Sequence, residues 1–206
     1  TPDHKHQQRR LMPTLIPLPP SADRLPPSPV LEKTCAWLLR RLGWSMRGEW
    51  PDLKKMVVIA APHTSIWDVI IGLLVIQGMG LKVVFMGKKE AFFWPAGALL
   101  KHFGGMPVDR SAPGGIIEQA AGMIRDSERL WFTLAPEGTR KPVDKWKTGF
   151  WKIAKQAEVP VCCAYFHFPD KVVGVGPVFH LSDDMDADIA RIRAWYAPYK
   201  GKSRRR

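Results

Sequence analysis

The sequence predicts an α/β fold: a single domain with a largely parallel sheet flanked by helices. A length of 206 residues fits one domain. Hydrophobic residues make up 46% of the chain, which is enough to build a core. Short apolar runs alternate with segments of helical pattern, as in folds that place helices on a parallel sheet. We expect a proline-rich, disordered arm at 1–29, a folded domain at 30–198 and a basic tail at 199–206.

The elements of the first half can be justified in order. Residues 1–29 hold eight prolines and no clear periodicity, which indicates an extended arm. Residues 30–46 mix apolar side chains with basic ones, which is typical of an amphipathic helix. This helix could lie on an anionic membrane, or it could pack on the core with its arginines in water. The apolar run at 56–61 predicts a buried strand, followed by a helix at 65–78.

The second half continues the alternation. A second strand is expected at 81–86, followed by an aromatic-rich helix at 92–103 that Pro95 interrupts. Strands alternating with helices favour a parallel sheet, because each parallel connection needs a crossover. The remaining elements are expected as a helix at 116–126, a strand at 130–134, a helix at 150–157, strands at 161–168, 171–176 and 178–180, and a helix at 186–196.

The formal net charge of +12 favours anionic partners: nucleic acid, acidic lipid headgroups or phosphorylated substrates. Part of the excess belongs to the tail, where the last seven residues supply five positive charges. The rest of the chain is still basic, so some of the positive field belongs to the folded domain.

Cysteine content and hydropathy bear on the compartment. Three cysteines, Cys35, Cys162 and Cys163, do not form the pattern of a disulfide framework, which favours a reducing, cytoplasmic-side location. No run approaches the ~20 apolar residues that span a bilayer, and no signal-peptide pattern opens the sequence. The sequence begins at Thr1 rather than at a methionine, so a preceding anchor stays an open question.

One stretch combines acid–base groups with a strand end. His63 follows the strand predicted at 56–61, and Asp68 falls in the first turn of the next helix. Catalytic groups in open α/β sheets gather at such ends. His63 could act as a general base, with Asp68 fixing its tautomer. Ser65 and Asp68 also match a helix capping box, and a histidine before a helix can simply bond a carbonyl, so these residues alone leave both interpretations open.

Four sequence blocks stand in order along the chain. The first is His63 to Asp68, and the second is the run FGGMPVDR at 103–110. The third is PEGTR at 136–140, and the fourth is VPV at 159–161. Over about residues 45 to 180 they resemble the lysophosphatidic acid acyltransferase family, the glycerolipid acyltransferases with an H-x4-D motif. The chain departs from the family in having Pro62 before the histidine and no second proline in the fourth block.

This resemblance implies acyl transfer from an acyl thioester, acyl-CoA or acyl-carrier protein, to the hydroxyl of a lysophospholipid such as lysophosphatidic acid. It implies His63 and Asp68 as the catalytic pair and no metal or tightly bound cofactor. It also implies an acceptor phosphate held by the second and third blocks. The expected substrate-binding residues are Arg110, Glu137, Gly138, Thr139 and Arg140. Arginine suits this role because its planar fork binds phosphate through two hydrogen bonds.

Other functions fit fewer observations. The aromatic run at 92–95 lies beside lysines and suits a headgroup boundary, although core packing would explain it too. With the amphipathic helix at 30–46, it predicts a peripheral protein on the cytoplasmic face of an anionic membrane. The family resemblance implies that such a protein acts in phospholipid synthesis or remodelling. A nucleic-acid binder would use the basic tail but gives His63 and Asp68 no role, so no nucleic acid is expected. Acylation of a lyso-aminolipid and an inactive lipid-binding scaffold are the alternatives.

Overall fold

A mixed seven-stranded sheet forms the centre of the computed structural model, which describes residues 15–88, 92–108, 115–141 and 143–202. The strand order across the sheet is β1-β7-β6-β2-β5-β3-β4. The strands are β1 (Ser45–Arg47), β2 (Lys55–Ala61), β3 (Val84–Lys88), β4 (Gly105–Val108), β5 (Leu130–Leu134), β6 (Val161–His167) and β7 (Val172–Phe179). The helices are α2 (Pro29–Arg41), α3 (Ile66–Met79), α4 (Ala96–His102), α5 (Gly115–Asp126), α6 (Gly149–Gln156) and α7 (Met185–Tyr196).

Strand β2 lies in the middle of the sheet and pairs in parallel with β5 on one side and β6 on the other. Val57 is opposite Phe132 of β5 and Val161 of β6. The β6–β7 pair is antiparallel, whereas β1–β7, β3–β5 and β3–β4 are parallel. The predicted α/β domain with a largely parallel sheet is confirmed. Because β2, β5 and β6 run the same way, their carboxyl ends share one edge of the sheet.

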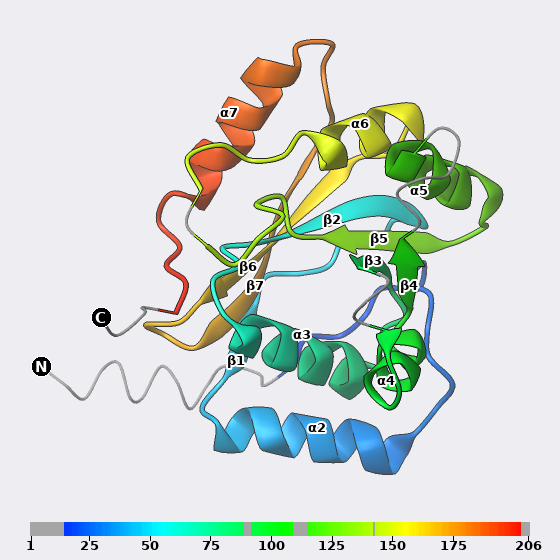
Figure 1. Ribbon diagram of the computed structural model, residues 1–206. Coiled ribbons are helices and arrows are strands. Elements are labelled where there is room, and N and C mark those ends of the chain that lie inside the picture. The colour runs from blue at the N-terminus through cyan, green and yellow to red at the C-terminus, as the bar shows by residue number, and fades with distance from the viewer. Residues whose placement is uncertain (1–14, 89–91, 109–114, 142, 203–206) are drawn as a thin grey trace, which may run out of the picture.

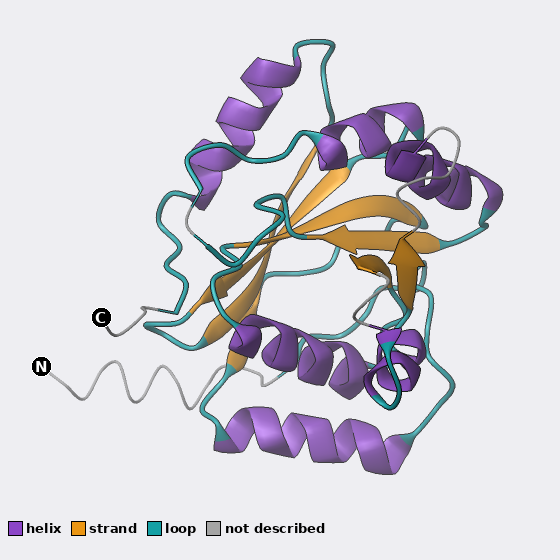
Figure 2. Cartoon of the chain, in the orientation of Figure 1, coloured by secondary structure: helices purple, strands orange, loops and turns teal. Residues whose placement is uncertain are grey.

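Helices cover both faces of the sheet, α2, α3 and α4 on one side and α5, α6 and α7 on the other (Figures 1 and 2). Ile71 and Val75 of α3 pack against one face, and Leu39 of α2 joins the same core. Ile124 of α5 and Phe150 of α6 pack on the opposite face. The alternation of side chains along each strand produces this division: Trp131 of β5 belongs to the first core and its neighbour Phe132 to the second.

The expected disordered arm is wrong for residues 15–28. Ile16 and Ala22 are buried in the core, and Leu25 donates a backbone hydrogen bond of 2.9 Å to Gly80. Apolar residues between the prolines let this segment cover the core without regular structure. Residues 1–14 lie outside the described part of the chain.

Several strands and helix boundaries differ from the prediction. The helix expected at 30–46 ends at Arg41, because residues 45–47 leave it to pair with β7 as β1. Strand β4 had no counterpart in the prediction. Helix α4 begins only at Ala96, after Pro95, rather than at residue 92. The strand expected in two pieces after residue 171 is continuous as β7.

Candidate active site

The turn between β2 and α3 carries the candidate acid–base pair. Strand β2 ends at Ala61, and α3 begins at Ile66 after Ser65, whose extended backbone and side chain form the N-cap. The Ser65 hydroxyl accepts a hydrogen bond of 2.9 Å from the Trp67 N–H. His63 lies in the turn itself, so its ring projects from the strand end rather than from the helix.

The structure brings His63 and Asp68 together. Nδ1 of His63 is 3.3 Å from Oδ2 of Asp68, and the Asp68 side chain is fully buried while that of His63 is about one-fifth exposed. A carboxylate beside Nδ1 favours the tautomer that carries its proton there. Nε2 is then the ring nitrogen left for a substrate proton.

The same Asp68 oxygen also holds the backbone of the turn. Oδ2 accepts hydrogen bonds of 2.5 Å from the Thr64 N–H and 2.7 Å from the Ser65 N–H. The capping box predicted as an alternative to a catalytic role is therefore present, and it coexists with the His63 contact. One carboxylate caps the helix and faces the imidazole, so the two interpretations describe a single geometry.

Glu137 joins this turn from the neighbouring strand. It follows β5, and its Oε2 accepts a hydrogen bond of 2.6 Å from the backbone N–H of His63, 74 residues away. Burial raises the pKa of the Glu137 carboxyl, although the hydrogen bond from His63 acts in the opposite direction. The resemblance implied that Glu137 binds substrate; in the structure its carboxylate contacts the backbone of the turn that carries His63.

The remaining residues of the third block form an exposed loop after β5. Gly138 has a positive φ of 64°, which favours glycine, and the Thr139 hydroxyl accepts a hydrogen bond of 3.2 Å from the Lys141 N–H. Arg140 is exposed. The side chain of Lys147 passes over Gly138, where a Cβ atom would come within 2.7 Å of it. Lys147 thus adds a cation to this loop that sequence reasoning missed, since no motif marks it.

Arg110, predicted to bind the acceptor phosphate, lies outside the described residues. The strand that leads to it, β4, ends at Val108 and pairs in parallel with β3. Its carboxyl end therefore lies on the same edge of the sheet as those of β2 and β5.

Within the described residues, no group of three or more His, Cys, Asp or Glu side chains could hold a metal ion. Among the same residues, no helix combines the length and apolarity needed to cross a membrane.

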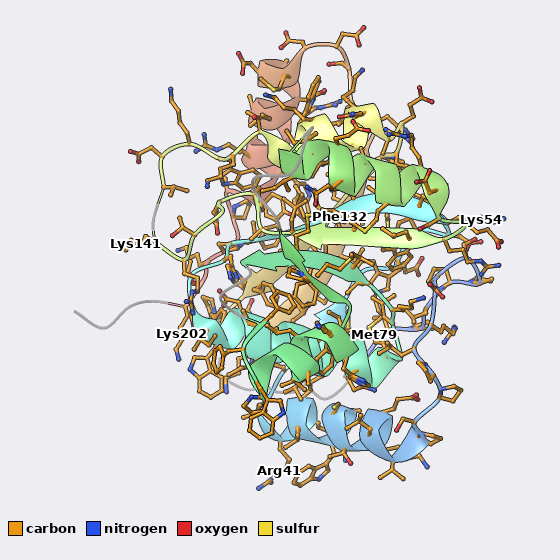
Figure 3. All side chains as sticks on the ribbon, turned by 45° about the vertical axis from the view of Figure 1, so that its right-hand side comes forward. Arg41, Lys54, Met79, Phe132, Lys141 and Lys202 are labelled. Carbon is orange, nitrogen blue, oxygen red and sulfur yellow. The ribbon has the colours of Figure 1, made fainter. Side chains whose placement is uncertain are left out.

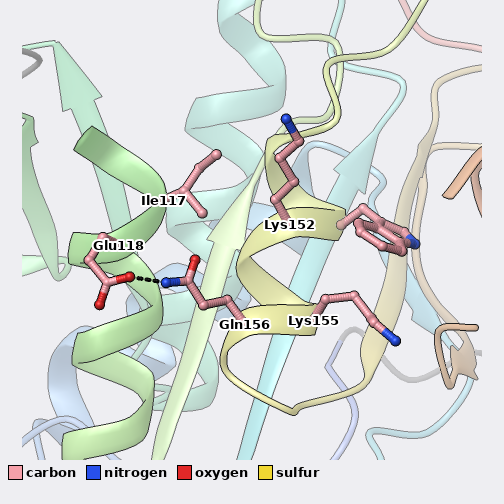
Figure 4. A pocket seen from close by; sticks show the side chains of 6 residues that line it. Ile117, Glu118, Lys152, Lys155 and Gln156 are labelled. Atoms are coloured by element: carbon pink, nitrogen blue, oxygen red, sulfur yellow. Dashed lines mark hydrogen bonds between the residues drawn. The ribbon is translucent and has the colours of Figure 1, made fainter. Parts of the chain in front are cut away.

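Hollows lie along the helical layer of α5 and α6. One, of about 620 Å³, lies between α5 and α6 (Figure 4); Glu118 accepts a hydrogen bond from Gln156 across it, and Lys152 lines it. Another, of about 590 Å³, is lined mostly by apolar groups, among them Phe132 and Leu134 of β5, together with Lys147. The second hollow reaches Ala135, two residues before Glu137, so it adjoins the candidate site.

Comparison with known proteins agrees with the geometry. A family model described as Acyltransferase matches residues 39–167, which include the turn, β5 and Glu137. No curated protein sequence matches the chain significantly. The fold is similar to the crystal structure of the 1-acyl-sn-glycerophosphate (LPA) acyltransferase PlsC from Thermotoga maritima, with a TM-score of 0.54 and 16% identity over 84% of this chain and 80% of that one.

Proposed function

The chain belongs to the acyltransferase family, and we propose that it moves an acyl group from a thioester to the hydroxyl of an anionic lysophospholipid such as lysophosphatidic acid. The observation that carries this proposal is the His63–Asp68 pair in a turn that the family model covers. The donor is acyl-CoA or acyl-carrier protein, whose negative charge suits a chain of net charge +12.

The proposed reaction is a direct transfer. His63 Nε2 takes the proton of the acceptor hydroxyl as that oxygen attacks the thioester carbonyl. Asp68 stabilises the imidazolium that forms, from its place beside Nδ1. The tetrahedral intermediate then expels the thiolate, which receives the proton from His63. The products are an ester and a free thiol, and no covalent acyl-enzyme is needed.

The basic loop after β5 supports an anionic acceptor. Arg140 is exposed on this loop, and the Lys147 side chain crosses it at Gly138. A phosphate there could form charge-assisted hydrogen bonds with both side chains. Because Glu137 of the same loop bonds the His63 backbone, an acceptor held on this loop lies against the catalytic turn.

The apolar hollow beside β5 supports a place for the acyl chain. Its walls combine Phe132, Leu134 and Ile153 with the open backbone of Gly149. A Cβ atom at Gly149 would meet nothing within 4 Å, so a large side chain there would enter free space. We expect Gly149→Phe to shift the preferred acyl chain to shorter lengths, measured as kcat/KM across donors. An unchanged preference would place the acyl chain elsewhere.

A peripheral position on the cytoplasmic face of a membrane is part of the same proposal. Helix α2 packs on α3 through buried Cys35 and Leu39 but leaves Trp37 about half exposed. Phe93 and Trp94, before α4, are exposed as well. Exposed aromatic side chains near basic ones suit the boundary between headgroups and acyl chains.

The test is product formation from defined substrates. Purified protein would receive labelled acyl-CoA or acyl-carrier protein with a panel of lysolipids that includes lysophosphatidic acid and lyso-aminolipids. We expect acylated product with a phosphate-bearing acceptor and none with His63→Ala. Product only from a lyso-aminolipid would correct the acceptor class. Binding of lipid without turnover, unchanged in the variant, would favour a scaffold.

A further inference from the structure

The C-terminal segment returns to the catalytic turn. From α7 it runs back past the turn between β6 and β7 (Figure 1). Tyr199 stacks on Tyr165 of β6, with ring centroids 3.8 Å apart. Lys200 donates a backbone hydrogen bond of 3.1 Å to Nδ1 of His167 and accepts one of 3.0 Å from Phe168. These contacts fix residues 199 and 200 against the carboxyl end of β6.

The next two residues contact the turn that carries His63. Lys202 donates a backbone hydrogen bond of 2.9 Å to the Thr64 hydroxyl. Gly201 packs so closely on Thr64 that a Cβ atom would overlap the threonine side chain. The Lys202 ammonium lies 4.8 Å from the centre of the Trp67 ring, within the range of a cation–π contact. Figure 3 shows Lys202 beside the N-terminal end of α3.

An exposed apolar patch adjoins this cation. Ile66, Trp67 and Ile70, all in the first turns of α3, are 52%, 41% and 38% exposed. Ile70 lies three residues after Trp67 and four after Ile66, so its side chain neighbours both on the helix surface. Large apolar side chains exposed next to one another often mark an interaction surface.

We propose that this patch, together with Lys200 and Lys202, forms a docking surface for an anionic lipid bilayer. Ile66, Trp67 and Ile70 would enter the headgroup boundary while Lys200 and Lys202, both exposed, meet lipid phosphates. This charge complementarity selects an anionic bilayer over a neutral one.

The inference rests on the proposed function for its purpose, because a lysophospholipid acceptor resides in a membrane. It adds a third contact to the two membrane contacts proposed above, those of α2 and of the aromatic residues before α4. Docking here would hold His63 close to the bilayer surface, since Thr64 and Trp67 lie between His63 and Asp68 in the chain and both contact Lys202.

The experiment measures partition of the full chain onto vesicles by sedimentation, without substrate. The vesicles are phosphatidylcholine alone or an equimolar mixture with phosphatidylglycerol. The test variant is Lys200→Ala/Lys202→Ala, which keeps the backbone hydrogen bonds. The control variant is Lys54→Ala/Lys152→Ala, which removes the same charge from exposed sites before β2 and on α6, outside the proposed surface. Thermal melting of both variants serves as the control for folding.

We expect the test pair to weaken binding to the mixed vesicles by about fivefold per lysine, and the control pair by much less. Trp67→Ala should weaken binding to both kinds of vesicle. Equal losses in the two pairs, or none in the test pair, would overturn the proposal. The proposal would also be overturned if the test pair left partition unchanged but raised the KM for the thioester in vesicle-free assays. That result would assign the two lysines to the donor phosphates. Vesicle binding is measured without turnover. A protein without acyltransferase activity would therefore refute the proposed function but would leave the docking surface to be decided by the vesicle assay.

Discussion

The turn that carries His63 and the loop after β5 lie on the same edge of the sheet but are built differently. In the turn, one buried carboxylate of Asp68 receives two backbone N–H groups and faces the His63 ring. In the loop, Gly138 and Arg140 are exposed, and the Thr139 hydroxyl bonds only two residues ahead. Glu137 is the link between them, through the His63 backbone.

In the proposed mechanism, the turn performs the chemistry and the loop recognises the acceptor. A general base must hold its geometry within a fraction of an ångström, and a helix cap provides that rigidity. An acceptor headgroup can be held by exposed cations whose side chains adjust. The comparison therefore predicts large rate effects in the turn and effects on acceptor binding in the loop.

His63→Ala should produce the largest effect, because it removes the proposed base. We expect kcat to fall by at least about 10³-fold, with the melting temperature nearly unchanged. His180→Ala is the matched control, since His180 is exposed and lies far along the chain. Turnover in His63→Ala near that of the control would remove the turn from the chemistry.

Asp68→Asn should lower kcat by about 10²–10⁴-fold, because the neutral amide no longer orients and stabilises the imidazolium. Ser65→Ala separates this role from helix capping: it removes the N-cap hydroxyl and should cost about 1 kcal/mol of unfolding free energy. We expect kcat of Ser65→Ala to change by less than about tenfold. If both variants lost activity in proportion to stability, Asp68 would serve the helix alone.

Arg140→Ala should act on binding. Loss of a charge-assisted hydrogen bond to phosphate should raise KM for a phosphorylated acceptor by about 10–100-fold with little change in kcat. Arg129→Ala, at the amino end of β5, controls for lost charge. Steady-state kinetics with a phosphate-free lysolipid should show no such increase. A fall in kcat with an unchanged KM would move Arg140 from recognition to chemistry.

The smallest effect on activity is expected at the two cysteines of β6, the strand that pairs with β2. Burial raises the pKa values of Cys162 and Cys163 in β6 to about 12, so both thiols stay protonated at neutral pH. Iodoacetamide should leave them unlabelled in the folded protein, with activity unchanged, and label them after denaturation. Rapid labelling in the native state, read by mass spectrometry, would show that β6 opens. That result would contradict a rigid sheet next to His63.

The sequence predicted the parts of the site that depend on neighbours in the chain. His63 and Asp68 are five residues apart, so a strand end followed by a helix cap suffices to bring them together. The bond from His63 N–H to Glu137 and the contact of Lys202 with Thr64 join residues 74 and 138 positions apart. No local pattern specifies such contacts, because they depend on how β2 and β5 pair and where the chain returns after α7.

The elements of the fold show the same distinction between local patterns and long-range contacts. Strand β5 was predicted to its ends, since its apolar residues are buried in the middle of the sheet. Strands β1 and β4, with three and four residues, escaped prediction because pairing with β7 and β3 defines them. The proline-rich residues 15–28 appeared disordered by composition, but they bury Ile16 and Ala22 against a core formed far along the chain.

The most direct test of the central claim is the tautomer of His63. Long-range ¹H–¹⁵N spectra of the protein, with the His63 signals identified by their loss in His63→Ala, distinguish the two ring nitrogens. We predict that the neutral ring carries its proton on Nδ1, facing Asp68, with Nε2 free to accept a proton, and that Asp68→Asn weakens this preference. A neutral ring protonated on Nε2, or a tautomer that Asp68→Asn leaves unchanged, would contradict the proposed role of the pair.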